Sequence, residues 1–425
     1  MSGQAADYPV FCGNLAKVCK SLVSTAQSPL FFHSRRMQVT QFDVLIVGGG
    51  LAGLSLACAL RGTRLRIALV EQRAPSRPAG WDVRVYAISP ANARFLQEIG
   101  VWKHLPSERI APLAAMEVFA DDGARLDFSA YASGLSELGW LLESSLLACE
   151  LWENVKRQGN LTLFSPAIPQ SVGVTGDKAV LALADGTMLS AKLLVGADGR
   201  DSWVRESLGL SAVSTPYGEL GLVANFECER RHRGIARQWF RADGVLAWLP
   251  LAGERISIVW STAEEHARFL LALADDELCA RVATAGQHAL GELKLLTSAA
   301  AFPLSLMRVP RTFAACLALI GDAAHGIHPL SGHGINLGFQ DARVLAELLA
   351  ATPEWQDIGN ERLLARYQRG RREEIVVLQS VTHALHQLFQ SQVPGARGLR
   401  NLGMNLANEL PVLKNLLVRY AIGAL

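Results

Sequence analysis

The stretch FDVLIVGGGLAGLSLACALRGTRLRIALVEQ, residues 42–72, decides the fold class of this chain. It begins with an apolar run typical of a buried strand, continues with three glycines and a helical apolar pattern, and ends with a second apolar run, RIALVE. A strand, a helix and a strand in this order predict a βαβ unit and therefore an α/β fold.

The glycine loop of this unit predicts a dinucleotide site. It reads G-x-G-x-x-G, in which the glycines allow a tight turn, close approach of the backbone to a pyrophosphate, and packing of helix on strand. The loop residues that we expect at the cofactor are Gly48, Gly50, Leu51, Ala52 and Gly53. Glu71 ends the second strand, where an acid accepts hydrogen bonds from a ribose hydroxyl and disfavours a 2′-phosphate. An ordinary tight turn is the alternative, but strand, helix and acid together favour NAD or FAD.

Composition limits the classes of function. The chain has 425 residues, of which 50% are hydrophobic, and it carries 41 Lys and Arg against 39 Asp and Glu. Because the charges nearly balance, we expect no nucleic acid among its partners. Seven cysteines without C-x-x-C spacing argue against a disulfide framework or a structural zinc, and they favour a reducing, cytoplasmic location.

The first 36 residues carry no periodic pattern, so we expect residues 1–36 to be a disordered extension or the product of a misassigned start. Ser34-Arg35-Arg36 before an apolar run imitates a twin-arginine export signal. Asp43 lies between the arginines and the apolar run, and three consecutive glycines are poor helix formers. The βαβ unit therefore explains the run better.

Two further motifs follow apolar strands later in the chain. AKLLVGADGRDSWVRE, residues 191–206, places Asp198-Gly199 directly after a strand, which by itself is an ordinary strand, turn and helix cap. ALIGDAAHGIHPLSGHGINLGFQD, residues 318–341, ends a second strand with Gly321-Asp322. A proline and two glycines then introduce a helix, which we expect over residues 335–350.

In this order, the three motifs resemble those of the aromatic-ring hydroxylases of the flavoprotein monooxygenase class, over about residues 41–350. The third motif, the segment DVRVYAIS at 82–89 and the tail RNLGMNLANELPVLKNLLVRYAIG look like the ubiquinone-biosynthesis hydroxylase family. The resemblance implies FAD as the cofactor. It also implies a Rossmann-like FAD-binding domain of the para-hydroxybenzoate-hydroxylase type, an antiparallel β-sheet substrate domain and a C-terminal helical region.

The resemblance also assigns residues to the cofactor. Asp322 is expected to bind the ribityl chain of FAD, Arg84 to lie near the cofactor, and Asp198 to contact FAD and the nicotinamide donor. The N-terminus of the helix after the third motif is suited to stabilise negative charge on a reduced flavin. The residues expected at this end of the site are Gly321, Asp322, Pro329, Gly332, Gly334 and Asn336. His333 and Ser144 stand where relatives often have Gln and Asn, so two polar contacts to the cofactor are expected to differ here.

Three histidines in the third motif, His325, His328 and His333, raise the alternative of a zinc site. A proline and two glycines prevent them from sharing one helix face. The one nearby carboxylate, Asp322, is already assigned to FAD. We therefore expect no metal.

Short alternating runs such as RISIVWST predict antiparallel strands of a second domain. We expect the FAD-binding domain over 41–111, 135–213 and 304–352, and the substrate domain over 112–134 and 214–303. The candidates for lining an aromatic pocket are Trp239, Phe240, Trp248 and Trp260, and Tyr217 is a weaker candidate for a hydrogen bond to a phenol. A sheet core is the more usual position of such aromatic side chains, so none is assigned to the site.

Residues 353–425 are expected to form a helical region. They hold nine Lys and Arg against six Asp and Glu, so basic charge is concentrated there. Leucines from Leu399 to Leu417 recur at steps of three and four, an amphipathic pattern that fits packing on the core. The alternative is docking of 396–425 on an anionic membrane surface or in a biosynthetic complex, which would place the protein peripherally on the inner face of a membrane.

The function implied by the resemblance is FAD-dependent hydroxylation of the aromatic ring of a polyprenylated phenol or quinone intermediate in ubiquinone biosynthesis. NAD(P)H is expected as a transient donor, O2 as the co-substrate and a flavin C4a-hydroperoxide as the oxygen-transferring species, so no catalytic side chain is assigned. The alternatives on this scaffold are a polyprenyl reductase and a halogenase, and the chain lacks the W-x-W-x-I-P segment of halogenases. A non-catalytic flavin-holding subunit of a biosynthetic assembly is the alternative from another class.

Overall fold

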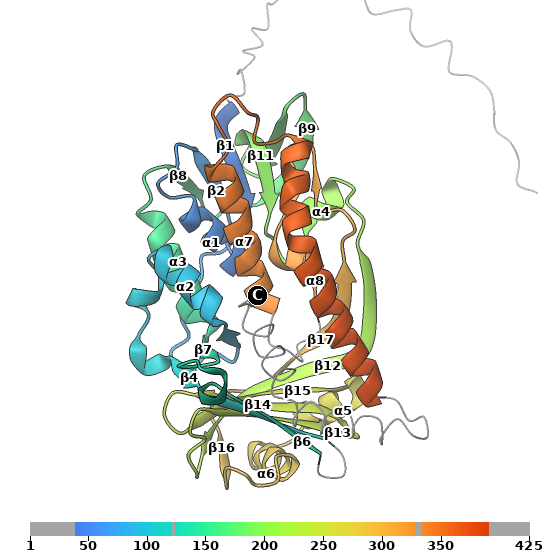
Figure 1. The fold of residues 1–425 in the computed structure, drawn as a ribbon. Coiled ribbons are helices and arrows are strands. Elements are labelled where there is room, and N and C mark those ends of the chain that lie inside the picture. The colour runs from blue at the N-terminus through green and yellow to red at the C-terminus, as the bar shows by residue number, and fades with distance from the viewer. Residues whose placement is uncertain (1–38, 121–123, 328–333, 391–425) are drawn as a thin grey trace, which may run out of the picture. The chain divides into compact units, whose positions relative to one another are not determined.

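The computed structural model describes residues 39–120, 124–327 and 334–390. The predictions for 1–36, Pro329, Gly332, His328, His333 and 396–425 therefore lie outside the described residues. The first sheet has the strand order β18-β19-β11-β1-β2-β8, with β10 beside β11 and β9 beside β10. Its strands β1, β2, β8, β9 and β11 are labelled in Figure 1. Its strands are β1 (Val39–Val47), β2 (Ile67–Val70), β8 (Leu161–Phe164), β9 (Pro169–Thr175), β10 (Lys178–Leu183), β11 (Met188–Gly196), β18 (Phe313–Ala314) and β19 (Leu317–Leu319). The pairs among β1, β2, β8, β11 and β19 are parallel, which confirms a Rossmann-like sheet.

The second half of strand β1, Val44 to Val47, is buried on both faces, which explains its continuous apolar sequence. Val44 and Ile46 belong to a hydrophobic core that helices α1, α3 and α7 share, while Leu45 and Val47 belong to a second core on the opposite face. The helices around this sheet are α1 (Leu51–Ala59), α2 (Pro90–Glu98), α3 (Ser144–Lys156), α4 (Trp203–Ser207) and α7 (Gly334–Ala350). The predicted helix over 335–350 is confirmed, one residue longer at its start.

The second sheet has nine strands in the order β20-β17-β12-β15-β14-β13-β5-β6, with β16 beside β12. Its strands are β5 (Ala115–Phe119), β6 (Arg125–Ser129), β12 (Val213–Cys228), β13 (Ile235–Arg241), β14 (Gly244–Leu251), β15 (Arg255–Ala263), β16 (Leu293–Leu295), β17 (Ala300–Arg308) and β20 (His325–Gly326). Helices α5 (Glu264–Leu271) and α6 (Asp275–Ala285) follow β15. One face of the sheet, with residues of α6, forms a core that contains Trp239, Trp248 and Trp260.

The second sheet departs from the expected antiparallel pattern at one pair. Strands β5 and β13 run parallel, with Ile235 opposite Ala115. The chain enters β5 after a short strand of another sheet, not through a hairpin from β13, so no tight turn imposes the antiparallel direction. The expected division between the two parts at 303–304 falls inside β17.

A third, small sheet and one long helix connect these layers. The small sheet pairs β3 (Val85–Ile88), β7 (Gly139–Glu143) and β4 (Ala111–Leu113). Helix α8 (Glu361–Gln390) packs along α7 and continues toward β17 and β12 (Figure 1). Tyr367 donates a hydrogen bond to the Leu319 carbonyl at 3.0 Å, and Gln379 donates one to the Met307 carbonyl at 2.8 Å. Helix α8 thus makes hydrogen bonds to both the first and the second sheet.

Candidate functional site

The glycine loop between β1 and α1 has backbone positions that only glycine fits. Gly48 has φ +110°, and a Cβ built there would lie 2.4 Å from the Ala197 carbonyl oxygen at the end of β11. A Cβ on Gly53 would lie 2.1 Å from the Gly48 carbonyl oxygen. A Cβ on Gly50, at the N-cap of α1, would meet nothing within 4 Å. The loop is therefore closed against β11 and open at the start of α1, where unpaired helix N–H groups attract phosphates.

Glu71 lies at the end of β2 against this loop, as predicted. Its Oε2 accepts a hydrogen bond from the Gly49 N–H at 2.5 Å, and its Oε1 accepts one from the Arg73 N–H at 2.8 Å. These bonds fix the carboxylate beside the glycines. A carboxylate in this position can accept further hydrogen bonds from ribose hydroxyls.

The second motif, Asp198-Gly199, is built around a helix cap. Asp198 accepts hydrogen bonds from the hydroxyl of Ser202, the N-cap of α4, at 2.5 Å and from the Val204 N–H at 2.9 Å, so its carboxylate supports the start of this helix. Arg205, also in α4, donates to the Ala323 carbonyl oxygen at 3.0 Å. The second motif is therefore bonded to the third, and the expected contact of Asp198 with FAD and the nicotinamide donor stays a prediction.

The third motif packs against the first through small residues. Gly321 has φ +61°, and a Cβ built there would lie 3.0 Å from the Ala52 Cβ of α1. Gly338 of α7 lies beside them, and a Cβ on it would make ordinary contacts of 3.5 Å with Ala52 Cβ and Gly321 Cα. The Gly48 contact with Ala197 joins the first motif to the second. All three motifs therefore meet in one place.

A buried charge network that we did not predict holds the third motif. The Asp341 carboxylate of α7, 0% exposed, accepts bonds from the Gly321 N–H at 2.9 Å, from His325 Nε2 at 2.6 Å and from Arg371 Nε of α8 at 2.7 Å. Arg371 also pairs with Glu374. Burial acts to raise the pKa of Asp341, but the charges of His325 and Arg371 outweigh it and hold that pKa below its ordinary value. The sequence signal that could have indicated this network is Asp341 itself, an acid within the apolar pattern of α7.

Of the three histidines considered as zinc ligands, the structure describes His325. His325 is buried and bonded to Asp341, so its ring positions the turn that carries Asp322. His328 and His333 lie outside the described residues. Within the ranges that the structure describes, no group of three or more His, Cys, Asp and Glu side chains is placed to hold a metal ion.

Two predicted cofactor residues make contacts with protein. Asn336, near the start of α7, donates to the Ala87 carbonyl at 2.7 Å and accepts from the Ser89 N–H at 3.0 Å, which ties α7 to β3. The guanidinium carbon of Arg84 lies 4.6 Å from the centroid of the Phe302 ring on β17. Asn336 thus positions the helix whose first residue is Gly334, and the direct contacts of these residues with the cofactor stay predictions.

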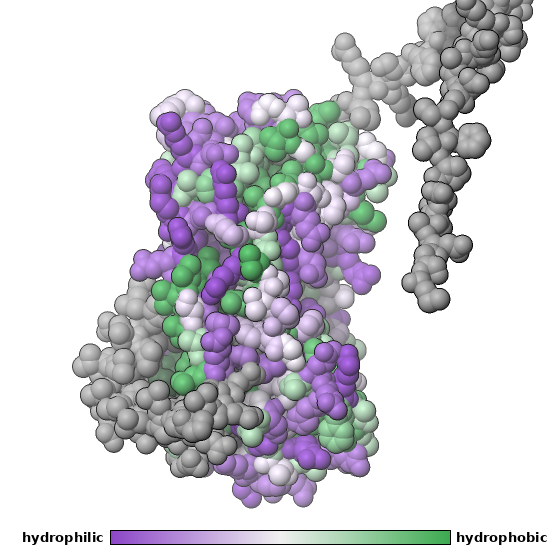
Figure 2. All heavy atoms as spheres, turned by 90° about the vertical axis from the view of Figure 1, so that its right-hand side faces the viewer, coloured by the Kyte–Doolittle hydropathy of each residue, from purple (hydrophilic) through white to green (hydrophobic). Residues whose placement is uncertain are grey.

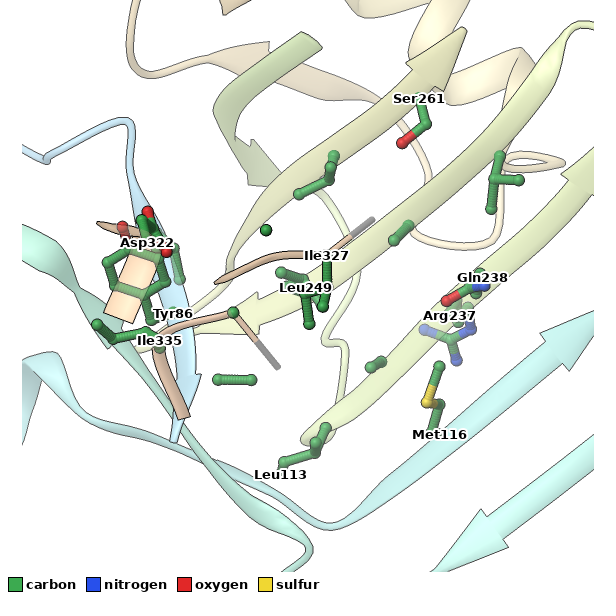
Figure 3. Close-up of a pocket in the computed structure, with 18 of the residues that line it drawn as sticks. Tyr86, Leu113, Met116, Arg237, Gln238, Leu249, Ser261, Asp322, Ile327 and Ile335 are labelled. Carbon is green, nitrogen blue, oxygen red and sulfur yellow. The ribbon is translucent and has the colours of Figure 1, made fainter. Parts of the chain in front are cut away.

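A cavity of about 350 Å³ extends from the third motif across the free face of the second sheet (Figure 3). Asp322, Tyr86 and Ile335 lie at one end, and Gln238, Met116 and Ser261 lie on strands away from it. The lining on the sheet comes from Ala236, Gln238, Val245, Ala247, Leu249, Val259 and Ser261. Strand alternation puts these side chains opposite the tryptophan core. The cavity is therefore mostly apolar, with a few polar groups, as small-molecule sites are.

At the polar end of the cavity, burial raises the pKa values of Asp322 and Tyr86. The Asp322 side chain remains accessible, but the protein around it limits hydration, which raises its pKa, while the charges of His325 and Arg200 oppose that rise. Burial and, to a lesser extent, the charge of Asp322 raise the pKa of Tyr86. The Tyr86 phenol therefore keeps its proton at neutral pH. The hydroxyl of Ser144, which stands where Asn was expected, acts in the opposite direction and lowers the pKa of this phenol slightly.

The aromatic candidates do not line this cavity. Trp239, Trp248 and Trp260 are at most 3% exposed in the sheet core, which confirms the more usual position of such side chains. Phe240 packs in a small cluster with Val118. The Tyr217 hydroxyl lies 3.2 Å from His383 Nδ1 on α8, so this phenol joins β12 to α8.

Comparisons with known proteins agree with this geometry. A family model described as the FAD binding domain matches residues 41–379. The chain is 36% identical over 388 residues to the ubiquinone hydroxylase UbiL of Rhodospirillum rubrum, covering 90% of each protein. It is 32% identical over 388 residues to the 3-demethoxyubiquinol 3-hydroxylase of Escherichia coli, covering 90% of this chain and 98% of that one. The solved structure of P. aeruginosa PqsL in complex with 2-aminobenzoylacetate aligns with a TM-score of 0.73 and 25% identity, covering 86% of this chain and 100% of that chain.

Proposed function

Because this chain belongs to the FAD-dependent hydroxylases of ubiquinone biosynthesis, we propose that it hydroxylates the aromatic ring of a polyprenylated phenol or quinone intermediate. Its co-substrates in this proposal are O2 and a reduced nicotinamide, NADH or NADPH. The chain is an FAD-dependent monooxygenase.

The observation that supports this function most is the meeting of three motifs at one end of an apolar cavity. Ala52 of the first motif contacts Gly321 of the third, and Arg205 after the second motif bonds to Ala323. Asp322 then borders the cavity beside Tyr86. A nucleotide held by the glycine loop would place its reactive ring where a second, apolar ligand can lie next to it.

The residues of the site fit FAD. The start of α1 is open beside Gly50, where a pyrophosphate needs backbone space. Glu71 is fixed where it can accept bonds from ribose hydroxyls, and Asp322 can accept bonds from the ribityl chain. When bound, FAD supplies the redox chemistry, taking electrons from the donor and activating O2.

The side chains around the cavity would orient the substrate and keep water out. Ala247, Leu249 and Val259 give the sheet face an apolar surface that suits an aromatic ring. Tyr86 keeps its proton and can donate a hydrogen bond to a developing oxyanion. Arg200, held by the Pro303 carbonyl at 2.7 Å, places a positive charge at the same end.

The test is turnover of the FAD-loaded protein with a short-chain prenylphenol under ¹⁸O2. We expect substrate-stimulated oxidation of NADH or NADPH and a product that carries one ¹⁸O atom. Reduction of the substrate without O2 would identify a polyprenyl reductase, and halide incorporation would identify a halogenase. Bound FAD without any turnover would identify a flavin-holding subunit.

We also propose that residues 396–425 attach the protein peripherally to an anionic membrane surface. The basic excess of 353–425 and the leucine pattern support this attachment. Among the helices within the described ranges, none has the length and apolar character to cross a bilayer. On the face drawn in Figure 2, hydrophobic and hydrophilic residues are interspersed.

Sedimentation with anionic liposomes tests this attachment. The full chain should co-sediment, whereas a chain without 396–425 should stay in the supernatant and keep its FAD. Equal sedimentation of the two proteins would dismiss the proposal.

A further inference from the structure

Two buried polar side chains at the far end of the cavity have no protein partner. Gln238 of β13 is 5% exposed and Ser261 of β15 is 3% exposed, and both line the cavity. No described residue makes a hydrogen bond with either side chain. Neither side chain is among the described buried groups whose polar atoms are sealed off without a hydrogen-bond partner, so these atoms open onto the cavity, where water or a ligand can bond to them. An amide and a hydroxyl left open to a cavity therefore point to polar atoms of a ligand.

The strand register places the two groups on one surface. Gln238 lies opposite Ala247, and Val245 lies opposite Ser261. Gln238 and Ser261 are thus two strand spacings apart across the sheet and two residues apart along it, roughly 12 Å in all. The side chains between them are small and apolar, which leaves a surface on which an aromatic ring can lie with polar substituents directed toward the two groups (Figure 3).

The charges around the cavity indicate which substituents suit this end. Gln238 and Ser261 are neutral. Arg237 also borders the cavity, and its guanidinium pairs with the Glu117 carboxylate, Nε to Oε2 2.9 Å, while its buried Nη1 has no hydrogen-bond partner among the described residues. The other charged side chains of the described lining, Arg200 and Asp322, belong to the opposite end. A carboxylate substituent would therefore lose its water beside Gln238 and meet only a guanidinium whose charge Glu117 already balances, whereas a hydroxyl, methoxyl or carbonyl oxygen would gain a hydrogen bond.

We propose that Gln238 determines substrate specificity by hydrogen-bonding an uncharged oxygen substituent of the ring, with Ser261 as a second contact. The amide donates to a methoxyl or carbonyl oxygen, or accepts from a hydroxyl. Gln238 thereby selects rings that bear an oxygen substituent and no carboxylate on the side remote from Asp322. This assignment rests on the proposed function for the identity of the ring, and on the cavity itself for the contact.

The test uses the FAD-loaded protein and three ring analogues that differ only in one substituent, methoxyl, methyl or carboxylate. Binding is read from the change each analogue causes in the flavin absorbance spectrum. The wild type should bind the methoxyl compound about tenfold more tightly than the methyl and carboxylate compounds. In Gln238→Leu the preference for methoxyl over methyl should disappear, and in turnover KM should rise for the methoxyl compound with little change in kcat.

The controls separate a specific contact from a general disturbance. Gln97→Leu makes the same change at an exposed position of α2 and should keep the wild-type preference. Ser261→Ala should reduce the preference partially, which provides a second test if Gln238→Leu does not retain FAD. Wild-type preference in both Gln238→Leu and Ser261→Ala, or tight carboxylate binding by the wild type, would overturn the inference. Since the spectrum reports binding without turnover, a protein that binds these rings selectively but never hydroxylates them would refute the proposed function alone.

Discussion

Replacing Asp341 with Asn should weaken both the fold and the cofactor site. The carboxylate is 0% exposed and joins three elements, because it accepts bonds from Gly321, from His325 and from Arg371 of α8. Asparagine keeps the shape but removes the charge, and its amide group cannot accept all three bonds. Arg371, which is 4% exposed, then keeps only Glu374 as an ionic partner.

The magnitude follows from the burial of this pair. Breaking a buried ion pair by removing one partner costs about 3–5 kcal/mol. Because the bond between Arg371 and Glu374 remains, we expect the lower end, a loss of about 3 kcal/mol in the free energy of unfolding. The hydrogen bond from the Gly321 N–H to residue 341 should also weaken, by about 1 kcal/mol, and this loss should raise the Kd for FAD about fivefold.

Urea denaturation and a fluorescence titration with FAD measure these two effects. Glu347→Gln is the matched control, since it removes an acid from the same helix whose partner, Arg343, is exposed at the surface. This control should cost less than about 1 kcal/mol and leave the Kd for FAD unchanged. If Asp341→Asn and Glu347→Gln destabilise the protein equally, the buried network does not hold the site as described.

Four further predictions concern the cofactor loop and the network. Gly50→Val should leave the stability of the FAD-free protein nearly unchanged but weaken FAD binding at least about tenfold, because the valine side chain enters only the open space for phosphate. An unchanged affinity for FAD in a titration would argue against this site. Gly53→Ala should instead lower the melting temperature of the FAD-free protein, because its Cβ would lie 2.1 Å from the Gly48 carbonyl oxygen. Glu71→Gln should raise the Kd for FAD about fivefold, since a neutral acceptor replaces a charged one, and a Kd equal to that of wild type would remove Glu71 from the site. Burial acts to raise the pKa of Asp341, but its cationic partners lower this pKa by more than burial raises it. The stabilising contribution of the carboxylate is therefore complete above about pH 4 and is lost as the pH falls. The difference in unfolding free energy between wild type and Asp341→Asn should narrow in acid, and a constant difference would contradict this prediction.

The parts of the fold that the sequence predicts are those set by local chemistry. Gly48 and Gly53 occupy positions where a side chain would collide with backbone, so the motif and the turn coincide. The apolar sequence of β1 follows from burial of both its faces, and strand alternation likewise separates the tryptophan core from the cavity. These constraints act over a few residues, and a pattern in the sequence can therefore report them.

The features of the fold and site that the sequence does not predict depend on contacts between segments far apart in the chain. Asp341 and Arg371 are 30 positions apart on different helices, and neither position alone reveals its partner. The parallel pairing of β5 with β13 joins segments more than a hundred residues apart, without a turn motif to signal it. Gln238 reads as one polar residue in a strand, and only the register shows that it faces a cavity.

Equilibrium titration of the FAD-free protein with FAD shows whether the three motifs form one flavin site. We expect saturation at one FAD per chain, with the yellow flavin spectrum recovered in the purified complex and with a lower affinity for FAD in Gly50→Val. A chain that remains colourless at saturating FAD, or that binds FAD equally well after Gly50→Val, would contradict this expectation.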